Sequence, residues 1–245
     1  MLYCKSNRPI NSKKSFTGDK MRIYRKTLPS KITEKAVELV ADHAKSLDSR
    51  AFIFCESKAT LSYESLIAEK FGGSFSIEVT SFSRYVTKRT GGLNYLGKSA
   101  SALVIADILA KNREKLARLK SSNYTTATSV YELIEQLKAT KITPLDLDGI
   151  ISAERTALSY KLSDIRLVFF EYENYLAEHG LTDDGMVLSL MPDLLRADES
   201  IKGAKVVVAG INNFTRQSVD IVVALEKFCD LDCVLLSYDG DSADN

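Results

Sequence analysis

The sequence predicts an α/β fold in which a parallel sheet is interrupted by a long helical insertion. Short apolar runs alternate with amphipathic helical segments near both ends of the chain, a pattern typical of parallel sheets with helices on both faces. Residues 86–200 show helical periodicity instead. We therefore expect a flexible lead-in over 1–20, an α/β core formed by 21–85 and 201–245, and a helical insertion subdomain over 86–200.

The first part of the core is expected to contain two helices between three strands. Continuous apolar residues at 51–55 (AFIFC) indicate a central parallel strand. Thr33 is expected to cap the first helix, and Gly72 to end the second. In chain order we expect a strand at 22–24, a helix at 33–47, a strand at 51–55, a helix at 61–71 and a strand at 77–81.

Helices are expected throughout the insertion. Ser129 and Glu132 have the spacing of a capping box, and Pro144 after Thr143 suits a helix start. A long amphipathic helix is expected at 152–178; it is typical of core packing rather than of a ligand box. Its apolar stripe is Leu158, Leu162, Ile165, Phe169, Tyr172 and Leu176. Further helices are expected at 101–119 and 185–195.

The strand pattern returns near the end of the chain. The runs at 205–210 (KVVVAG) and 233–238 (CVLLSY) indicate buried strands, and 216–229 indicates the helix between them. This restores the α/β alternation after the insertion.

Composition excludes several classes of protein. The chain has 245 residues, of which 45% are hydrophobic and 27% charged, as in ordinary globular proteins. No apolar run approaches the ~20 residues of a membrane span, and the basic N-terminus has no signal-peptide core. With four cysteines and two histidines, a zinc site is not expected. We expect a cytoplasmic protein without a metal site or membrane contact.

The net charge of +1 conceals an asymmetric distribution. Residues 1–31 hold nine Lys or Arg and one Asp, and 84–120 hold nine Lys or Arg and two acidic residues. Residues 171–200 and the last twenty residues are acidic. This asymmetry indicates a polyanion on one side and a protein partner on the other; a solvated surface without partners is the alternative.

Five segments, in this order, resemble the N-terminal region of the AddB (RexB) family, the second subunit of an ATP-dependent helicase–nuclease (exodeoxyribonuclease). They are FIFCES (52–57), EVTSFSRYV (78–86), ITPLDL (142–147), KLSDI (161–165) and VVVAGINNFTRQ (206–217). The resemblance implies a RecA-like sheet of the P-loop NTPase, UvrD-type superfamily 1 helicase kind. It also implies a role in DNA double-strand-break repair and recombination, with an AddA-type motor and nuclease subunit as the heterodimer partner.

The phosphate-binding loop of such motors is degenerate here. An active loop reads G-x-x-x-x-G-K-[ST], whose glycines and lysine cradle phosphates while the hydroxyl binds Mg²⁺. The equivalent stretch, 24–33 (YRKTLPSKIT), lacks both glycines and has Ile32 in place of the hydroxyl. Ser30 and Lys31 are the candidate remnants of the nucleotide site, with an exposed helix-start lysine as the alternative. No carboxylate follows the strand that ends at Val208, so we expect no ATP hydrolysis.

In superfamily 1 motors the turns after the second and third strands face the DNA strand, so the resemblance implies that the same turns face DNA here. Hydroxyl and cationic side chains suit phosphate contacts. Phe82 is expected in the core, and a surface salt bridge is the alternative for Arg84. The candidate DNA-binding residues are Ser57, Lys58, Thr60, Ser81, Ser83 and Arg84.

The family's nuclease and cysteine-ligated iron–sulfur cluster lie far toward the C-terminus of much longer chains, so we expect them downstream of residue 245. ATP with Mg²⁺ and a nuclease metal belong to the complex, and no cofactor or catalytic residue is expected in this part. The resulting hypothesis is an ATPase-inactive scaffold, not an enzyme by itself, that binds single-stranded DNA and docks on the motor subunit. The alternatives are weak nucleotide binding at Lys31 and a purely structural partner-binding module.

Overall fold

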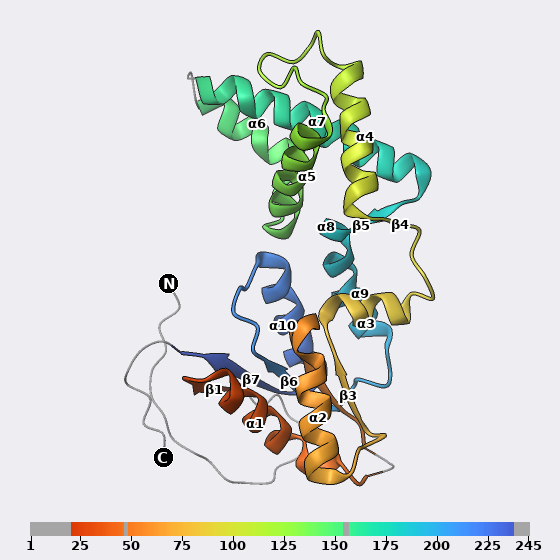
Figure 1. The fold of residues 1–245 in the computed structure, drawn as a ribbon, viewed down its shortest axis with the longest axis vertical. Coiled ribbons are helices and arrows are strands. Elements are labelled where there is room, and N and C mark those ends of the chain that lie inside the picture. Colours follow the sequence, from red (N-terminus) through yellow and green to blue (C-terminus); the bar gives the residue numbers. More distant parts are fainter. Residues whose placement is uncertain (1–20, 47–48, 154–156, 238–245) are drawn as a thin grey trace.

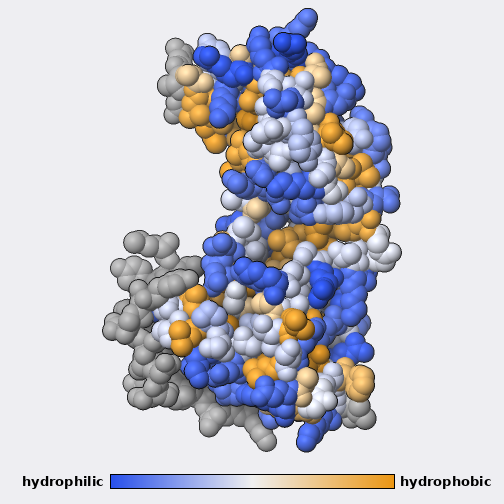
Figure 2. All heavy atoms as spheres, in the orientation of Figure 1, coloured by the Kyte–Doolittle hydropathy of each residue, from blue (hydrophilic) through white to orange (hydrophobic). Residues whose placement is uncertain are grey.

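The computed structural model describes residues 21–46, 49–153 and 157–237. The predicted lead-in over 1–20 lies outside the described residues. An α/β part and a helical part lie at opposite ends of an elongated molecule (Figure 1). In the space-filling view the outline is concave on one side between the two parts (Figure 2).

A five-stranded sheet with the order β1-β7-β6-β2-β3 forms the centre of the α/β part, and every pairing is parallel. This confirms the predicted α/β fold with a parallel sheet. All residues of the central strands β2 and β6 are buried, as their continuous apolar runs require. The strands are β1 (Arg22–Lys26), β2 (Ala51–Phe54), β3 (Ile77–Thr80), β6 (Lys205–Ala209) and β7 (Asp230–Leu236).

Helices cover both faces of the sheet because strand side chains alternate between them. Phe52 and Phe54 pack with one set of helices, and Ile53 packs with the other. The helices on the Ile53 face are α1 (Pro29–Leu39) and α2 (Thr60–Phe71). Those on the Phe52 face are α3 (Phe82–Arg89), α9 (Met191–Ala197) and α10 (Arg216–Phe228).

The helical part has a core of its own, between α4 (Lys98–Lys111), α5 (Tyr124–Ala139), α6 (Pro144–Ala153) and α7 (Ala157–His179). Ile165, Phe169, Tyr172 and Leu176 are buried, as the predicted stripe requires, whereas Leu158 is 52% exposed.

Short elements connect the two parts. Two short parallel strands, β4 (Tyr95–Leu96) and β5 (Thr182–Asp183), pair with each other. After β5 come α8 (Asp184–Val187) and a 3₁₀ turn, η3 (Leu188–Leu190). Two further 3₁₀ turns, η1 (Ala41–His43) and η2 (Ser57–Ala59), belong to the α/β part.

Several predicted boundaries are wrong for identifiable reasons. Helix α1 begins at Pro29, because proline suits the first turn of a helix, so Thr33 lies inside the helix and does not cap it. Asn123 caps α5 by accepting a 2.8 Å hydrogen bond from the N–H of Thr126, so Ser129 is also interior. Strand β7 begins at Asp230, earlier than predicted, because the buried Asp232 forms a 2.5 Å ion pair with Lys205. The predicted start of α6 at Pro144 is confirmed.

Candidate functional site

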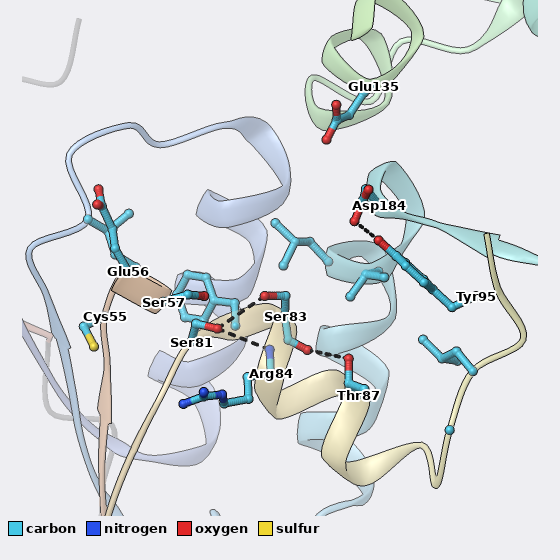
Figure 3. A pocket seen from close by; sticks show the side chains of 16 residues that line it. Cys55, Glu56, Ser57, Ser81, Ser83, Arg84, Thr87, Tyr95, Glu135 and Asp184 are labelled. Atoms are coloured by element: carbon cyan, nitrogen blue, oxygen red, sulfur yellow. Dashed lines mark hydrogen bonds between the residues drawn. The ribbon is translucent and has the colours of Figure 1, made fainter. Parts of the chain in front are cut away.

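A cleft of about 770 Å³ lies beyond the carboxyl ends of β2 and β3, where the sheet approaches α8 and η3 (Figure 3). Ligands of parallel α/β sheets bind at this end of the strands. The polar residues of the lining are Glu56, Ser57, Ser81, Ser83, Arg84, Thr87, Tyr95, Glu135 and Asp184.

The sheet side of the cleft is built by the turn from β3 into α3. Ser81 is in an extended conformation and caps α3, since its Oγ accepts a 3.3 Å hydrogen bond from the N–H of Arg84. The hydroxyls of Ser81 and Ser83 are 3.3 Å apart. The cap fixes the direction of the first helical turn, so Ser83 and Arg84 project from a defined position. Phe82 is buried, as predicted.

Arg84 is the only cation among the described residues of the lining, and it is exposed. Within the described ranges, no ion pair or side-chain hydrogen bond involves its guanidinium. The neighbouring Cys55 is buried at the end of β2, and burial raises the pKa of its thiol to about 12 despite the opposing charge of Arg84. Arg84 is therefore available to an external anion, and Cys55 is a protonated core side chain.

The opposite side of the cleft comes from the segment that the sequence pattern assigns to the insertion. The hydroxyl of Tyr95 donates a hydrogen bond to Asp184, and both burial and this bond raise the pKa of Tyr95. Burial, followed by the charge of Asp184, raises the pKa of Glu135. The sequence pattern does not predict these residues, because only the pairing of β4 with β5 brings Tyr95 to Asp184.

The cleft collects four of the six predicted DNA-binding residues, namely Ser57, Ser81, Ser83 and Arg84. Lys58 points into solvent and forms a 2.9 Å ion pair with Glu56. Thr60 is buried, and its hydroxyl donates a 3.1 Å hydrogen bond to the carbonyl of Ser57.

The charges of the cleft are divided between its two sides. The carboxylates of Glu135 and Asp184 lie across from Arg84 (Figure 3). Glu56 adds a third carboxylate beside the end of β2, on the same side as Arg84, and Lys58 pairs with it at 2.9 Å. A polyanion would therefore contact the sheet side and be repelled by the opposite side.

The candidate nucleotide residues lie on the first turn of α1. Ser30 is exposed, and the ammonium of Lys31 forms a 2.9 Å ion pair with Glu34. Ile32 is 3% exposed and belongs to the core. Gly210 follows β6 and lies close to the same core side chains. A Cβ added to it would lie 3.3 Å from the Tyr63 hydroxyl and 3.7 Å from Ile32, so there is little free space beside Ile32. Ile32, a core side chain, occupies the position of the metal-binding hydroxyl of a P-loop, so these residues do not supply that ligand for a nucleotide–Mg²⁺ group.

Among the residues that the structure describes, no group of three or more His, Cys, Asp or Glu side chains is arranged to hold a metal ion. Across the same ranges, none of the helices combines the length and apolarity that crossing a bilayer demands.

Comparison with known proteins identifies a family. The model of the family described as ADDB, N-terminal, matches residues 38–245. A protein of Moorella thermoacetica, named as the B subunit of an ATP-dependent helicase/deoxyribonuclease, is 30% identical over 202 residues, covering 76% of this chain and 18% of the relative. Its namesake in Staphylococcus saprophyticus is 28% identical over 179 residues, covering 69% of this chain and 15% of the relative. The matched part of the chain therefore spans less than a fifth of the length of these relatives.

Proposed function

Because this chain belongs to the AddB N-terminal family, we propose that it is an ATPase-inactive, helicase-like region of a DNA-repair helicase–nuclease subunit. It acts as a scaffold that binds single-stranded DNA and docks on an AddA-type motor subunit. A RecA-like ancestry of its sheet is part of this proposal. The names of the relatives describe one subunit of a larger assembly, which supports the proposal that this chain has a partner subunit.

The observation that carries the DNA proposal is the meeting of Ser57, Ser81, Ser83 and Arg84 on one side of the cleft. Three hydroxyls and an exposed guanidinium provide phosphate contacts without reading base edges. The carboxylates across the cleft confine a strand to this side. We therefore expect weak binding with little dependence on sequence.

The buried position of Ile32 and the ion pair of Lys31 support the absence of ATP turnover. In this proposal, ATP with Mg²⁺, the nuclease metal and the iron–sulfur cluster act elsewhere in the complex. The chain is then no enzyme by itself.

The DNA proposal is tested by fluorescence anisotropy with a labelled (dT)20 strand at 50 and 200 mM salt. The wild type should bind at micromolar concentration and weaken as salt rises, because phosphate contacts release counterions. Arg84→Ala should bind several-fold more weakly. Arg196→Ala removes an exposed arginine paired with Asp193 on α9 and should bind like the wild type. If the wild type shows no salt-sensitive binding, the DNA role is rejected, and co-purification with the motor subunit then favours the structural module.

Nucleotide binding is tested separately by thermal melting. Millimolar ATP–Mg²⁺ should leave the melting temperature unchanged, because a ligand stabilises only a fold that binds it. A rise that Lys31→Ala abolishes would instead establish a nucleotide site on α1.

A further inference from the structure

The loop between α4 and α5, residues 112–123, forms the far end of the helical part (Figure 1). Its basic character was evident from the sequence, and the cleft does not account for it. We propose that this loop is a second DNA contact and that it binds the phosphate backbone of duplex DNA. The proposal does not require the cleft to bind DNA.

Buried contacts fix the backbone of the loop. The carboxylate of Asp164 on α7, itself 3% exposed, accepts hydrogen bonds from three consecutive N–H groups. These belong to Ala117, Arg118 and Leu119, at 2.8, 2.6 and 2.8 Å. Leu116 is 1% exposed and packs into the helical core. The loop is thus held at its centre by a charge-assisted cluster and an apolar anchor.

The loop presents its cations outward. Arg113, Lys115, Arg118 and Lys120 are all exposed, and in the described part of the chain no ion pair involves any of them. Lys111 at the end of α4 is also exposed, and it pairs with Asp107 at 2.6 Å. Hydrophilic atoms dominate this end of the surface (Figure 2).

The acidic groups nearby do not cancel this charge. Glu114 is the single acidic residue between 111 and 123. Asp164 is buried, and its charge is compensated by the N–H groups of the loop. Four exposed cations therefore remain on a fixed backbone. Such an array suits a polyanion whose charges are themselves closely and regularly spaced.

Duplex DNA fits this array better than a single strand does. Single-strand binding combines a basic groove with aromatic rings on which bases stack. Residues 111–123 include no aromatic residue. The exposed ring of Tyr124 comes directly after them, so the loop has one ring at its end and not a row of rings for successive bases. A duplex instead offers a stiff surface of phosphates that cations contact without reaching bases.

The loop and the cleft are separate sites. Tyr124 begins α5 beside the loop, whereas Glu135 on the same helix lines the cleft. The intervening turns correspond to about 17 Å at the α-helical rise. A duplex at the loop and a strand in the cleft thus have distinct contacts, so each can be removed alone.

The test uses the 245-residue chain with a blunt 20-base-pair duplex and with (dT)20, by anisotropy over a salt series. The loop variant combines Arg113→Gln, Lys115→Gln, Arg118→Gln and Lys120→Gln. The control variant combines Lys70→Gln, Arg196→Gln, Lys202→Gln and Lys227→Gln, which removes the same charge from exposed positions of the α/β part.

The loop variant should lose duplex affinity roughly tenfold or more at low salt, and its salt slope should fall by about 3 to 4. Its (dT)20 affinity should stay within threefold of the wild type, as should the duplex affinity of the control variant and of Arg84→Ala. If the fourfold variant melts early, two double variants, Arg113→Gln/Lys115→Gln and Arg118→Gln/Lys120→Gln, should each remove about half of the slope.

Unchanged duplex affinity in the loop variant overturns the proposal, as do equal losses in the loop and control variants. Binding of a polyglutamate peptide without duplex binding also overturns it, in favour of an acidic protein partner. Loss of (dT)20 binding in Arg84→Ala concerns the cleft alone, so failure of either DNA contact is distinguishable from failure of the other.

Discussion

The hydroxyl of Tyr85 on α3 donates a 2.7 Å hydrogen bond to the carboxylate of Asp198, just after α9. Arg89 donates to the same carboxylate at 2.5 Å and lies over the Tyr85 ring, 3.7 Å from its centroid. This cluster ties α3 to α9 behind the cleft. It therefore fixes the helix whose first turn carries Ser83 and Arg84.

Replacing Asp198 by Asn should destabilise the fold by about 1–3 kcal/mol at pH 7, because two charge-assisted bonds are lost. Burial alone would raise the pKa of Asp198, but hydrogen bonds from Ser200, Arg89 and Tyr85 outweigh it and hold this pKa well below its ordinary value. A lowered folded-state pKa stabilises the fold above the unfolded value of about 3.9, and the effect is lost as pH falls below it. Urea unfolding should therefore show that Asp198→Asn lowers the free energy of unfolding less at pH 3 than at pH 7.

The control is Asp193→Asn, which breaks the exposed pair with Arg196 and should cost less than about 0.5 kcal/mol. A loss for Asp198→Asn that is the same at both pH values would contradict the assigned pKa direction.

A buried ion pair joins the helical part to the connection with the sheet. Lys138 on α5 contacts Asp183 at 2.8 Å and Glu173 at 2.5 Å, and Asp183 is fully buried. Asp183→Asn should cost about 2–4 kcal/mol, because it leaves Lys138 buried with one carboxylate. Asp107→Asn breaks the exposed pair with Lys111 and should cost under about 0.5 kcal/mol. Unfolding in guanidinium measures the free energy of unfolding of both variants. If the two variants lose similar amounts, burial does not determine the contribution of the Lys138–Asp183 pair.

The presence of the five strands of the larger sheet and the residues on the sheet side of the cleft were predictable from local sequence. Continuous apolar runs mark β2 and β6, and polar residues at the ends of parallel strands meet at one edge. Ser57 comes two residues after the run at 51–55, and Ser81 is the last residue of the predicted strand at 77–81, so their positions were accessible without tertiary information.

The opposite side of the cleft and the start of β7 were not predictable in this way. Tyr95 meets Asp184 only through a pairing between residues far apart in the chain, which leaves no local pattern. Asp232 is a charged residue and obscures the strand, yet it is fully buried because Lys205 and Arg22 contact it. In both cases a long-range contact determines the local structure, and local periodicity does not contain it.

Ile32→Ser restores the residue type of a phosphate loop but should not restore nucleotide binding. The substitution removes a buried side chain and places a hydroxyl in the core, which should cost about 2–4 kcal/mol. Leu28→Ser changes a residue that is 54% exposed and should cost less than about 1 kcal/mol. Thermal melting without ATP–Mg²⁺ measures the stability of each variant, and the shift on adding ATP–Mg²⁺ measures nucleotide binding. A nucleotide-dependent rise in the Ile32 variant alone would show that the loop lacks only this hydroxyl.

Glu135→Gln should stabilise the protein at neutral pH. Burial, and then the charge of Asp184, raise the pKa of Glu135, so the folded state binds the proton of this side chain more tightly than the unfolded state does. The ionised carboxylate therefore destabilises the fold at pH above the folded-state value, and acidification removes the penalty. The gain should stay below about 1 kcal/mol at pH 7, since solvent screens this partly buried group, and should vanish near pH 4. A gain that persists at pH 4 would contradict this sign.

The same substitution also tests whether the cleft holds a strand. Removing a carboxylate opposite Arg84 should strengthen (dT)20 binding about two- to fivefold at 50 mM salt, because like-charge repulsion of phosphates falls. Glu132→Gln lies on the same helix but pairs with Lys98 outside the cleft, so it is the matched control. It should change the affinity by less than Glu135→Gln does. Equal gains in the two variants would mean that net charge, and not the cleft, determines binding.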